Sequence, residues 1–219
     1  MARPNPAARA GVVAAAQQLM TSRGYAATTV DQICEAAGVT KGTFFHYFAS
    51  KEALAAAALE ESCRAQLAQY DAAPFTREPD PLKRLDEFIE FTIEMADPTR
   101  HSCLAGVFAQ EISGTHPELR KMCADALGGM RDTIRPLLDA IKRAYGPRSR
   151  IDTGALAEHY VTIFEGSFII AKANADARPF AGSLRHFAAY VRALFAPAPA
   201  AARRSPSPRK TPSRARRSA

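Results

Sequence analysis

The chain has 219 residues, a formal net charge of +7 and a pI near 9.5. Seven of its 29 basic residues lie at or beyond position 203, where no acidic residue occurs, so residues 1–202 carry 22 basic and 22 acidic residues. The positive charge therefore belongs to the C-terminal tail and does not by itself predict a nucleic-acid partner. The four cysteines form no CxxC pair, and no apolar run approaches the roughly 20 residues that a membrane span needs. We therefore expect a protein of the reducing cytoplasm with no membrane contact, and not a disulfide scaffold.

Apolar residues recur at helical spacing through most of the chain, and no window shows the alternation of a half-buried strand. The sequence predicts an all-α protein. The first helix is expected to begin with Asn5 as its cap and Pro6 at its first position, and to end at Gly24. Thr29 is expected to cap the second helix, with Gln32 three residues later completing a capping box.

Gly38 is expected to end this second helix, and Thr40 to cap a short third helix that runs through Tyr47. Ser50 is expected to cap a long fourth helix that reaches about Tyr70. Residues 71–81 contain three prolines and are predicted to be a linker between two domains. Further helices are expected at 82–95, 104–112, 117–145, 152–175 and 180–195, and residues 197–219 have the composition of a disordered tail.

Residues 28–48 read TTVDQICEAAGVTKGTFFHYF and are followed by ASKEAL. This segment resembles the TetR/AcrR family of transcriptional regulators. The resemblance implies an N-terminal three-helix helix-turn-helix domain that binds DNA, here residues 1–50 with the motif at about 29–48. It also implies a C-terminal helical domain for ligand binding and dimerisation, here residues 51–196, with 197–219 as the basic tail.

A helix of about seven residues between two sharp breaks is too short to be stable alone, so it must be held in place by its surroundings. Such a helix fits the major groove with its first residues at the base edges. Phe45 is open to a second interpretation, as a packing residue. The expected DNA contacts, of which Tyr47 and Lys51 rest on the resemblance, are Thr28, Thr29, Thr40, Lys41, Gly42, Thr43, Phe45, His46, Tyr47 and Lys51.

The stretch from Ser102 to Glu111, followed by residues 116–120, resembles a branch of the family that includes sensors of reactive electrophiles. In that branch a cysteine at the position of Cys103 can be the reactive group. A reactive thiol needs access and a lowered pKa, and Lys172 is a cation that could face it across a pocket. Alternatively, Cys103 is a small buried residue and Lys172 reaches solvent. The expected ligand or sensor residues are Cys103, Phe108, Phe164, Phe168 and Lys172, with Phe88 and Phe91 as further aromatic lining unless these aromatics are simply core.

The helix at 180–195 carries one apolar stripe, which either a partner subunit or the helix at 152–175 of the same chain would bury. The resemblance implies a homodimer on palindromic operator DNA and repression that a small-molecule effector relieves. The alternative is a DNA-associated protein without sequence preference, driven by the basic tail.

The histidines form no metal-ligand pair, and there is no phosphate-cradling glycine loop or nucleophile elbow. We therefore expect no cofactor, metal site or catalytic residue, and no enzymatic activity.

Overall fold

The computed structural model describes residues 6–112, 114–146 and 150–195, and within these ranges it contains only helices, turns and loops. The prediction of an all-α protein is confirmed. The expected cap Asn5 and the tail from 197 lie outside the described residues. The helices are α1 (Pro6–Arg23), α2 (Val30–Ala37), α3 (Lys41–Tyr47), α4 (Lys51–Ala72), α5 (Pro81–Met95), α6 (Leu104–Ile112), α7 (Pro117–Tyr145), α8 (Thr153–Asn174) and α9 (Arg178–Phe195), with a 3-10 turn, η1 (Pro74–Arg77), between α4 and α5.

The predicted caps of the second, third and fourth helices are confirmed. Thr29 accepts from the backbone N–H of Gln32 while the Gln32 side chain accepts from the Thr29 N–H, which completes the capping box. Gly38 ends α2 in the left-handed region, at φ 64°. Thr40 and Ser50 accept from the backbone N–H groups three residues later and so start α3 and α4. Local sequence thus determines where each of these helices begins.

The predicted linker at 71–81 is partly wrong. Helix α4 continues to Ala72, and the turn η1 follows before α5 begins at Pro81. The cause is Phe75, which is buried and packs its ring against those of Tyr70 and Phe88. An aromatic anchor therefore holds the proline-rich segment against the core.

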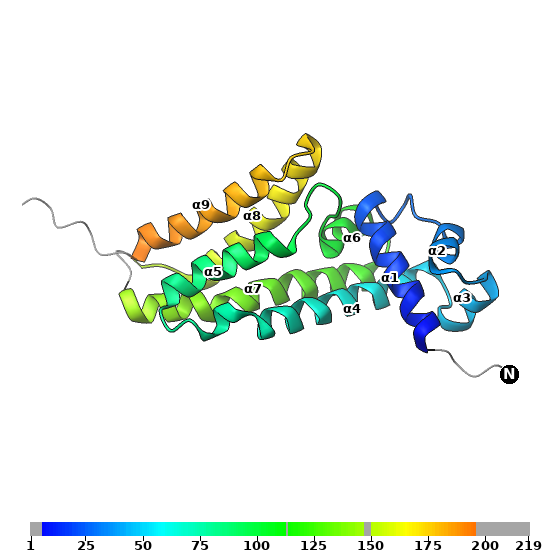
Figure 1. Ribbon diagram of the computed structural model, residues 1–219, viewed down its shortest axis with the longest axis horizontal. Helices are drawn as coiled ribbons and strands as arrows, with labels where there is room; N and C mark the ends of the chain where they lie inside the picture. Colours follow the sequence, from blue (N-terminus) through cyan, green and yellow to red (C-terminus); the bar gives the residue numbers. More distant parts are fainter. Residues whose placement is uncertain (1–5, 113, 147–149, 196–219) are drawn as a thin grey trace, which may run out of the picture.

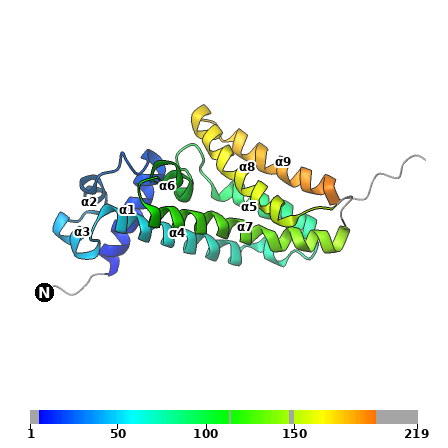
Figure 2. The ribbon, with the colours of Figure 1, turned by 180° about the vertical axis from the view of Figure 1, so that it is seen from behind.

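The helices form an elongated molecule in which α1, α2 and α3 lie together at one end (Figure 1). Helices α4 and α7 run side by side along its length, and α8 and α9 pack against each other (Figure 2). Two clusters of buried side chains result. The first joins α1–α4 to α6 and the start of α7, and the second joins η1, α5, α8 and α9 to the rest of α7. No helix in the described part of the chain is long and apolar enough to cross a membrane.

The apolar stripe of α9 is buried within the chain. Leu184, Phe187, Val191 and Phe195 are at most 1% exposed, and α9 packs on α8 and α5. Of the two explanations left open by the sequence, burial within one subunit accounts for this stripe. A contact between subunits needs a different face.

Candidate functional site

Helices α2 and α3 present a polar, accessible surface at the end of the molecule. Thr29, Thr40, Lys41, Gly42 and His46 are exposed, as residues that contact a partner must be. The Oγ1 atoms of Thr40 and Thr43 lie 3.0 Å apart, so the start of α3 carries two adjacent hydroxyls.

Charge and aromatic surface flank these hydroxyls. The Lys41 ammonium lies 2.7 Å from a carboxylate oxygen of Asp31 on α2, and this pairing raises the pKa of Lys41. Phe45 is 54% exposed while the adjacent Phe44 is fully buried and anchors the helix. Of the two interpretations of Phe45, the exposed position favours contact with a partner. The ring of His46 packs edge-on against that of Tyr47 at 4.9 Å.

The structure contradicts the prediction that the Thr28 side chain contacts DNA. Its side chain is fully buried, and its hydroxyl donates to the backbone carbonyl of Gly24 at 2.7 Å. The hydroxyl therefore closes the turn between α1 and α2 and is not accessible to a phosphate. Thr29 and the start of α2 remain exposed beside it.

Lys51 at the start of α4 supports this turn. Its ammonium donates to the carbonyls of Tyr25 and Thr28 at 3.1 and 3.0 Å and lies 4.0 Å above the Tyr25 ring. The Tyr25 hydroxyl donates to Glu52 at 2.9 Å. An ammonium has three N–H groups, and these two bonds use two of them. Lys51 therefore holds the turn between α1 and α2 through two backbone carbonyls.

The C-terminal helices hold the end of α1 at two places. Glu111 on α6 accepts from the backbone N–H of Ala26 at 2.7 Å, and its carboxylate fills the space where a Cβ on Gly24 would lie. Gly24 has φ 94°, which residues with a Cβ rarely adopt, so the backbone conformation favours glycine at this position. Lys172 on α8 donates to the carbonyls of Thr21 and Ser22. These contacts connect α6 and α8 to the end of α1 and to the turn before α2.

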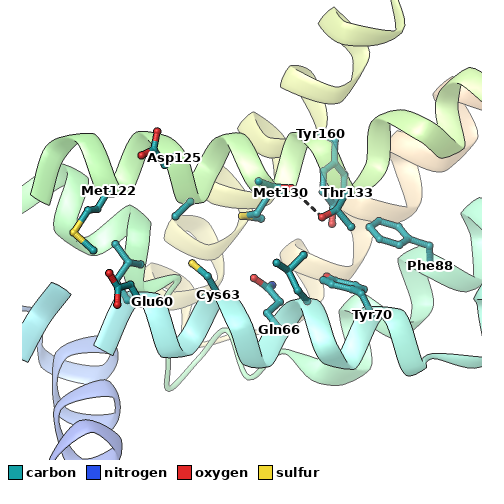
Figure 3. A pocket seen from close by; sticks show the side chains of 14 residues that line it. Glu60, Cys63, Gln66, Tyr70, Phe88, Met122, Asp125, Met130, Thr133 and Tyr160 are labelled. Carbon is teal, nitrogen blue, oxygen red and sulfur yellow. Dashed lines mark hydrogen bonds between the residues drawn. The ribbon is translucent and has the colours of Figure 1, made fainter. Parts of the chain in front are cut away.

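A cavity of about 400 Å³ lies between α4 and α7, closed by single residues from α5 and α8 (Figure 3). We call it the α4–α7 cavity. Glu60 and Asp125 lie at one end, and Tyr70, Phe88 and Tyr160 at the other (Figure 3). The full lining is Leu59, Glu60, Cys63, Gln66, Leu67, Tyr70, Phe88, Met122, Asp125, Ala126, Gly129, Met130, Thr133 and Tyr160. Its size and largely apolar lining are those of a small-molecule site.

A second, more polar cavity of about 670 Å³, the α1–α8 cavity, is bounded by α1, α4, α5, the start of α6 and α8. Its lining includes Phe91, Phe164 and Phe168, as expected from the sequence, whereas Phe88 lines the α4–α7 cavity. Gln66 and Tyr70 line both cavities and separate them.

Phe108 is corrected as an expected ligand residue. It is fully buried in the first core and packs edge-on against Tyr25, with ring centroids 5.7 Å apart. Because α6 turns this side chain toward α1, it does not line either cavity. Phe108 therefore joins the two halves of the molecule and does not face a ligand.

Of the two arrangements of Lys172 and Cys103 that the sequence left open, the structure shows the second for Lys172, whose side chain is exposed and does not face the thiol. The Lys172 ammonium donates to the Ser102 hydroxyl and to the two α1 carbonyls on the exposed side of α8. Cys103 lines the α1–α8 cavity, but its neighbour is the carboxylate of Glu165. Burial and then this carboxylate raise the pKa of Cys103 well above the ordinary thiol value. The thiol is therefore protonated at neutral pH, which opposes rapid reaction with electrophiles.

The carboxylate of Glu165 is buried in an environment that disfavours its charged form. One of its carboxylate oxygens is buried without a hydrogen-bond partner among the described residues, and burial raises the pKa of the group. The pKa of Glu165 is higher in the folded state than the ordinary value of 4.5, because burial disfavours the charged carboxylate. The stability that goes with the neutral carboxyl is therefore fully present below pH 4.5 and is lost as pH rises through the folded-state pKa.

We expect Glu165→Gln to be more stable than the unsubstituted protein at pH 8, by on the order of 1 kcal/mol, because no charge is then buried without a partner. The difference should shrink toward pH 4.5 as the carboxyl becomes neutral in both states. Urea unfolding at pH 5 and pH 8 measures it. Glu158→Gln, an exposed glutamate on the same helix, is the control. Equal stability differences at both pH values would contradict the assignment.

Comparison with known proteins accounts for both halves of the molecule. Residues 7–58 match the model of the bacterial regulatory proteins of the tetR family, and residues 81–187 match that of a tetracyclin repressor-like C-terminal domain. The chain belongs to the TetR family. It is a transcriptional regulator with the helix-turn-helix and C-terminal helical domain of that family.

Relatives of this TetR-family chain include the transcriptional regulator AcuR of Cereibacter sphaeroides, 28% identical over 182 residues that cover 82% of this chain and 83% of the relative. The HTH-type transcriptional repressor DhaR of a Mycobacterium species is 25% identical, covering 74% and 81%. The crystal structure of a regulatory protein TetR from Rhodobacter sphaeroides superposes with a TM-score of 0.76 at 28% identity, covering 84% of this chain and 98% of that one. These relatives are regulators of transcription and not enzymes.

Several lining residues of the α4–α7 cavity in this TetR-family protein do not follow from the sequence pattern, which leaves Cys63 unassigned and does not single out Tyr70, Met130 or Tyr160. The sequence does offer one signal of a cavity at these positions, namely tyrosines on otherwise apolar helix faces. A buried tyrosine hydroxyl usually needs a hydrogen-bond partner, so such a residue often lies beside a polar group or a cavity. Gly129 in the middle of α7 is another, since glycine leaves space beside a helix.

Proposed function

We propose that this TetR-family regulator binds a palindromic operator as a homodimer and represses transcription until a small-molecule effector releases it. The observation that carries the proposal is the exposed start of α3, where Thr40, Lys41, Gly42 and Thr43 meet the requirements of a helix that enters the major groove. Thr29, Tyr47 and Lys51 are expected to contact phosphates beside it. Residues 1–50 form the DNA-binding domain in this proposal, and 51–196 sense the effector in the cytoplasm.

The outer face of α8 and α9 supports dimerisation. Ile169, Ile170 and Tyr190 are 56%, 50% and 48% exposed, which is unusual for large apolar residues on packed helices. Small residues such as Ala173 and Ala189 are exposed on the same two helices and allow close approach of a partner helix. A two-fold axis through this face would pair the α3 helices of two subunits, as a palindromic operator requires.

Selection of bound sequences from a random DNA pool tests the proposal. The full chain is incubated at physiological salt with excess non-specific competitor DNA, and bound molecules are sequenced. Recovery of a palindrome is expected. The absence of any enriched sequence would contradict the proposal and favour the alternative, DNA association through the seven cations at residues 203–217.

We expect Ile169→Glu to convert the dimer to a monomer at micromolar concentration, because a desolvated carboxylate without a partner disfavours an apolar interface. Affinity for a palindrome should fall on the order of 100-fold as the second half-site is lost. Sedimentation and anisotropy titrations measure the two effects. Met95→Glu alters an equally exposed apolar residue, 52% exposed, on α5 and should change neither. A dimeric Ile169→Glu protein would place the interface elsewhere.

A further inference from the structure

Helix α3, at the end of the molecule, carries an aromatic side chain on its outer face (Figure 1). Phe44 and Phe48 are at most 4% exposed and hold the inner side of the helix against the core, whereas Phe45 is 54% exposed. The Phe45 ring packs edge-on against the Phe44 ring, with the ring centroids 5.1 Å apart. A buried phenylalanine therefore supports the Phe45 ring from below, while about half of Phe45 stays accessible.

The neighbours of Phe45 on this outer face leave room for a close approach. Residues three and four apart share one face of a helix, so Phe45 lies one turn after Lys41 and Gly42, which are both exposed. Glycine is disfavoured inside a helix. A Cβ at Gly42 would have the Thr40 hydroxyl oxygen at 3.7 Å, an ordinary contact distance, so packing within the described chain does not demand glycine here. Close approach to a groove of DNA would favour it.

The chemistry of a phenyl ring restricts what Phe45 can face in the major groove. The ring has no hydrogen-bond donor or acceptor, so packing it on a phosphate or a polar base edge would remove water from that group without replacing the lost hydrogen bonds. The base pairs present donors, acceptors and one apolar group in the major groove, and that group is the 5-methyl of thymine. Of the four bases, thymine therefore matches the Phe45 ring best.

We infer that Phe45 packs against the 5-methyl group of a thymine in each half-site of the operator and so determines the base at that position. This inference rests on the proposed function, because it assigns base specificity to the surface proposed to enter the major groove. Each selected half-site should contain one invariant thymine. Removing its methyl group should weaken binding about fourfold per half-site, the usual effect of losing one buried methyl-sized group, and about 15-fold when both half-sites change.

Deoxyuridine tests the inference, because it differs from thymidine only by lacking the 5-methyl group. The palindrome recovered by selection is synthesised with deoxyuridine at one thymine position of both half-sites at a time, and anisotropy titration with the full chain measures each affinity. We expect one position at which the replacement weakens binding about 15-fold. Phe45→Ala should bind both DNAs more weakly and equally well. An effect of deoxyuridine on the DNA itself would persist in this variant, so the comparison isolates the contact.

Thr43→Ser is the matched control, because it removes another methyl group of α3 and keeps the hydroxyl that lies 3.0 Å from that of Thr40. This variant should keep the 15-fold ratio. Phe45→Ala should still fold, since the buried Phe44 and Phe48 anchor the helix.

Four results would overturn the inference and leave operator recognition intact. They are half-sites without an invariant thymine, an operator in which every thymine tolerates deoxyuridine, a ratio unchanged in Phe45→Ala, and a ratio lost in Thr43→Ser. Failure to recover any palindrome would instead overturn the proposed function, and this inference with it.

Discussion

Thr43→Glu is expected to weaken operator binding by at least about 100-fold at physiological salt. Thr43 lies in the first turn of α3, on the surface proposed to enter the major groove, where a carboxylate would meet the negative field of the phosphates. Anisotropy titration with the palindrome recovered by selection measures the change. A variant within threefold of the unsubstituted affinity would show that the start of α3 does not contact DNA.

The same substitution should leave the helix intact, which makes the result interpretable. Thr40 caps α3 and accepts from the backbone N–H of residue 43, so a glutamate there creates the reciprocal capping box and suits the helix dipole. We expect an unchanged or slightly higher melting temperature. Ala144→Glu adds the same charge to an exposed position at the far end of α7 and should leave affinity nearly unchanged (Figure 1).

Phe108→Ala is expected to lower the free energy of unfolding by about 3–5 kcal/mol, the usual cost of deleting a fully buried phenylalanine. For a chain of this length the melting temperature should fall by on the order of 10 °C. DNA affinity should fall as well, since Phe108 supports Tyr25 in the turn before α2. Urea unfolding and anisotropy measure the two effects.

Phe91→Ala is the matched control for this prediction. Phe91 is half-buried and lines the α1–α8 cavity, so its truncation should cost less than half as much. If Phe108→Ala were no more destabilising than Phe91→Ala, the burial of Phe108 between α6 and α1 would be wrong, and a ligand contact would again be the better explanation for this residue.

The N-terminal part of the fold could be predicted from local sequence in detail. Thr29, Thr40 and Ser50 are caps because a short hydroxyl side chain satisfies a backbone N–H within three residues, and Gly38 ends α2 because glycine tolerates a positive φ. These contacts are local, so chain order alone specifies them. For the same reason the TetR-type motif is recognisable from the order of residues 28–48 alone.

The cavities could not be predicted in this way, because they depend on how helices far apart in the chain face one another. The aromatic residues of α5, α6 and α8 have the same helical spacing whether they line a cavity or fill a core, and only packing places Phe108 in the core and Phe164 beside a cavity. The sequence correctly predicted that Cys103 lies at the start of a helix. Its charged neighbour is Glu165 and not Lys172, because the orientation of α8 about its axis determines which of these two side chains faces Cys103.

The sequence by itself thus determined the helical class, the starts and ends of most helices, and the surface of α2 and α3, since capping, periodicity and chain breaks act over a few residues. The tertiary structure decided which face of each helix is buried and therefore which side chains remain without partners. Within the described part of the chain, the unpaired carboxylate oxygen of Glu165 is a result of that kind, because a partner's absence depends on every helix packed around the group.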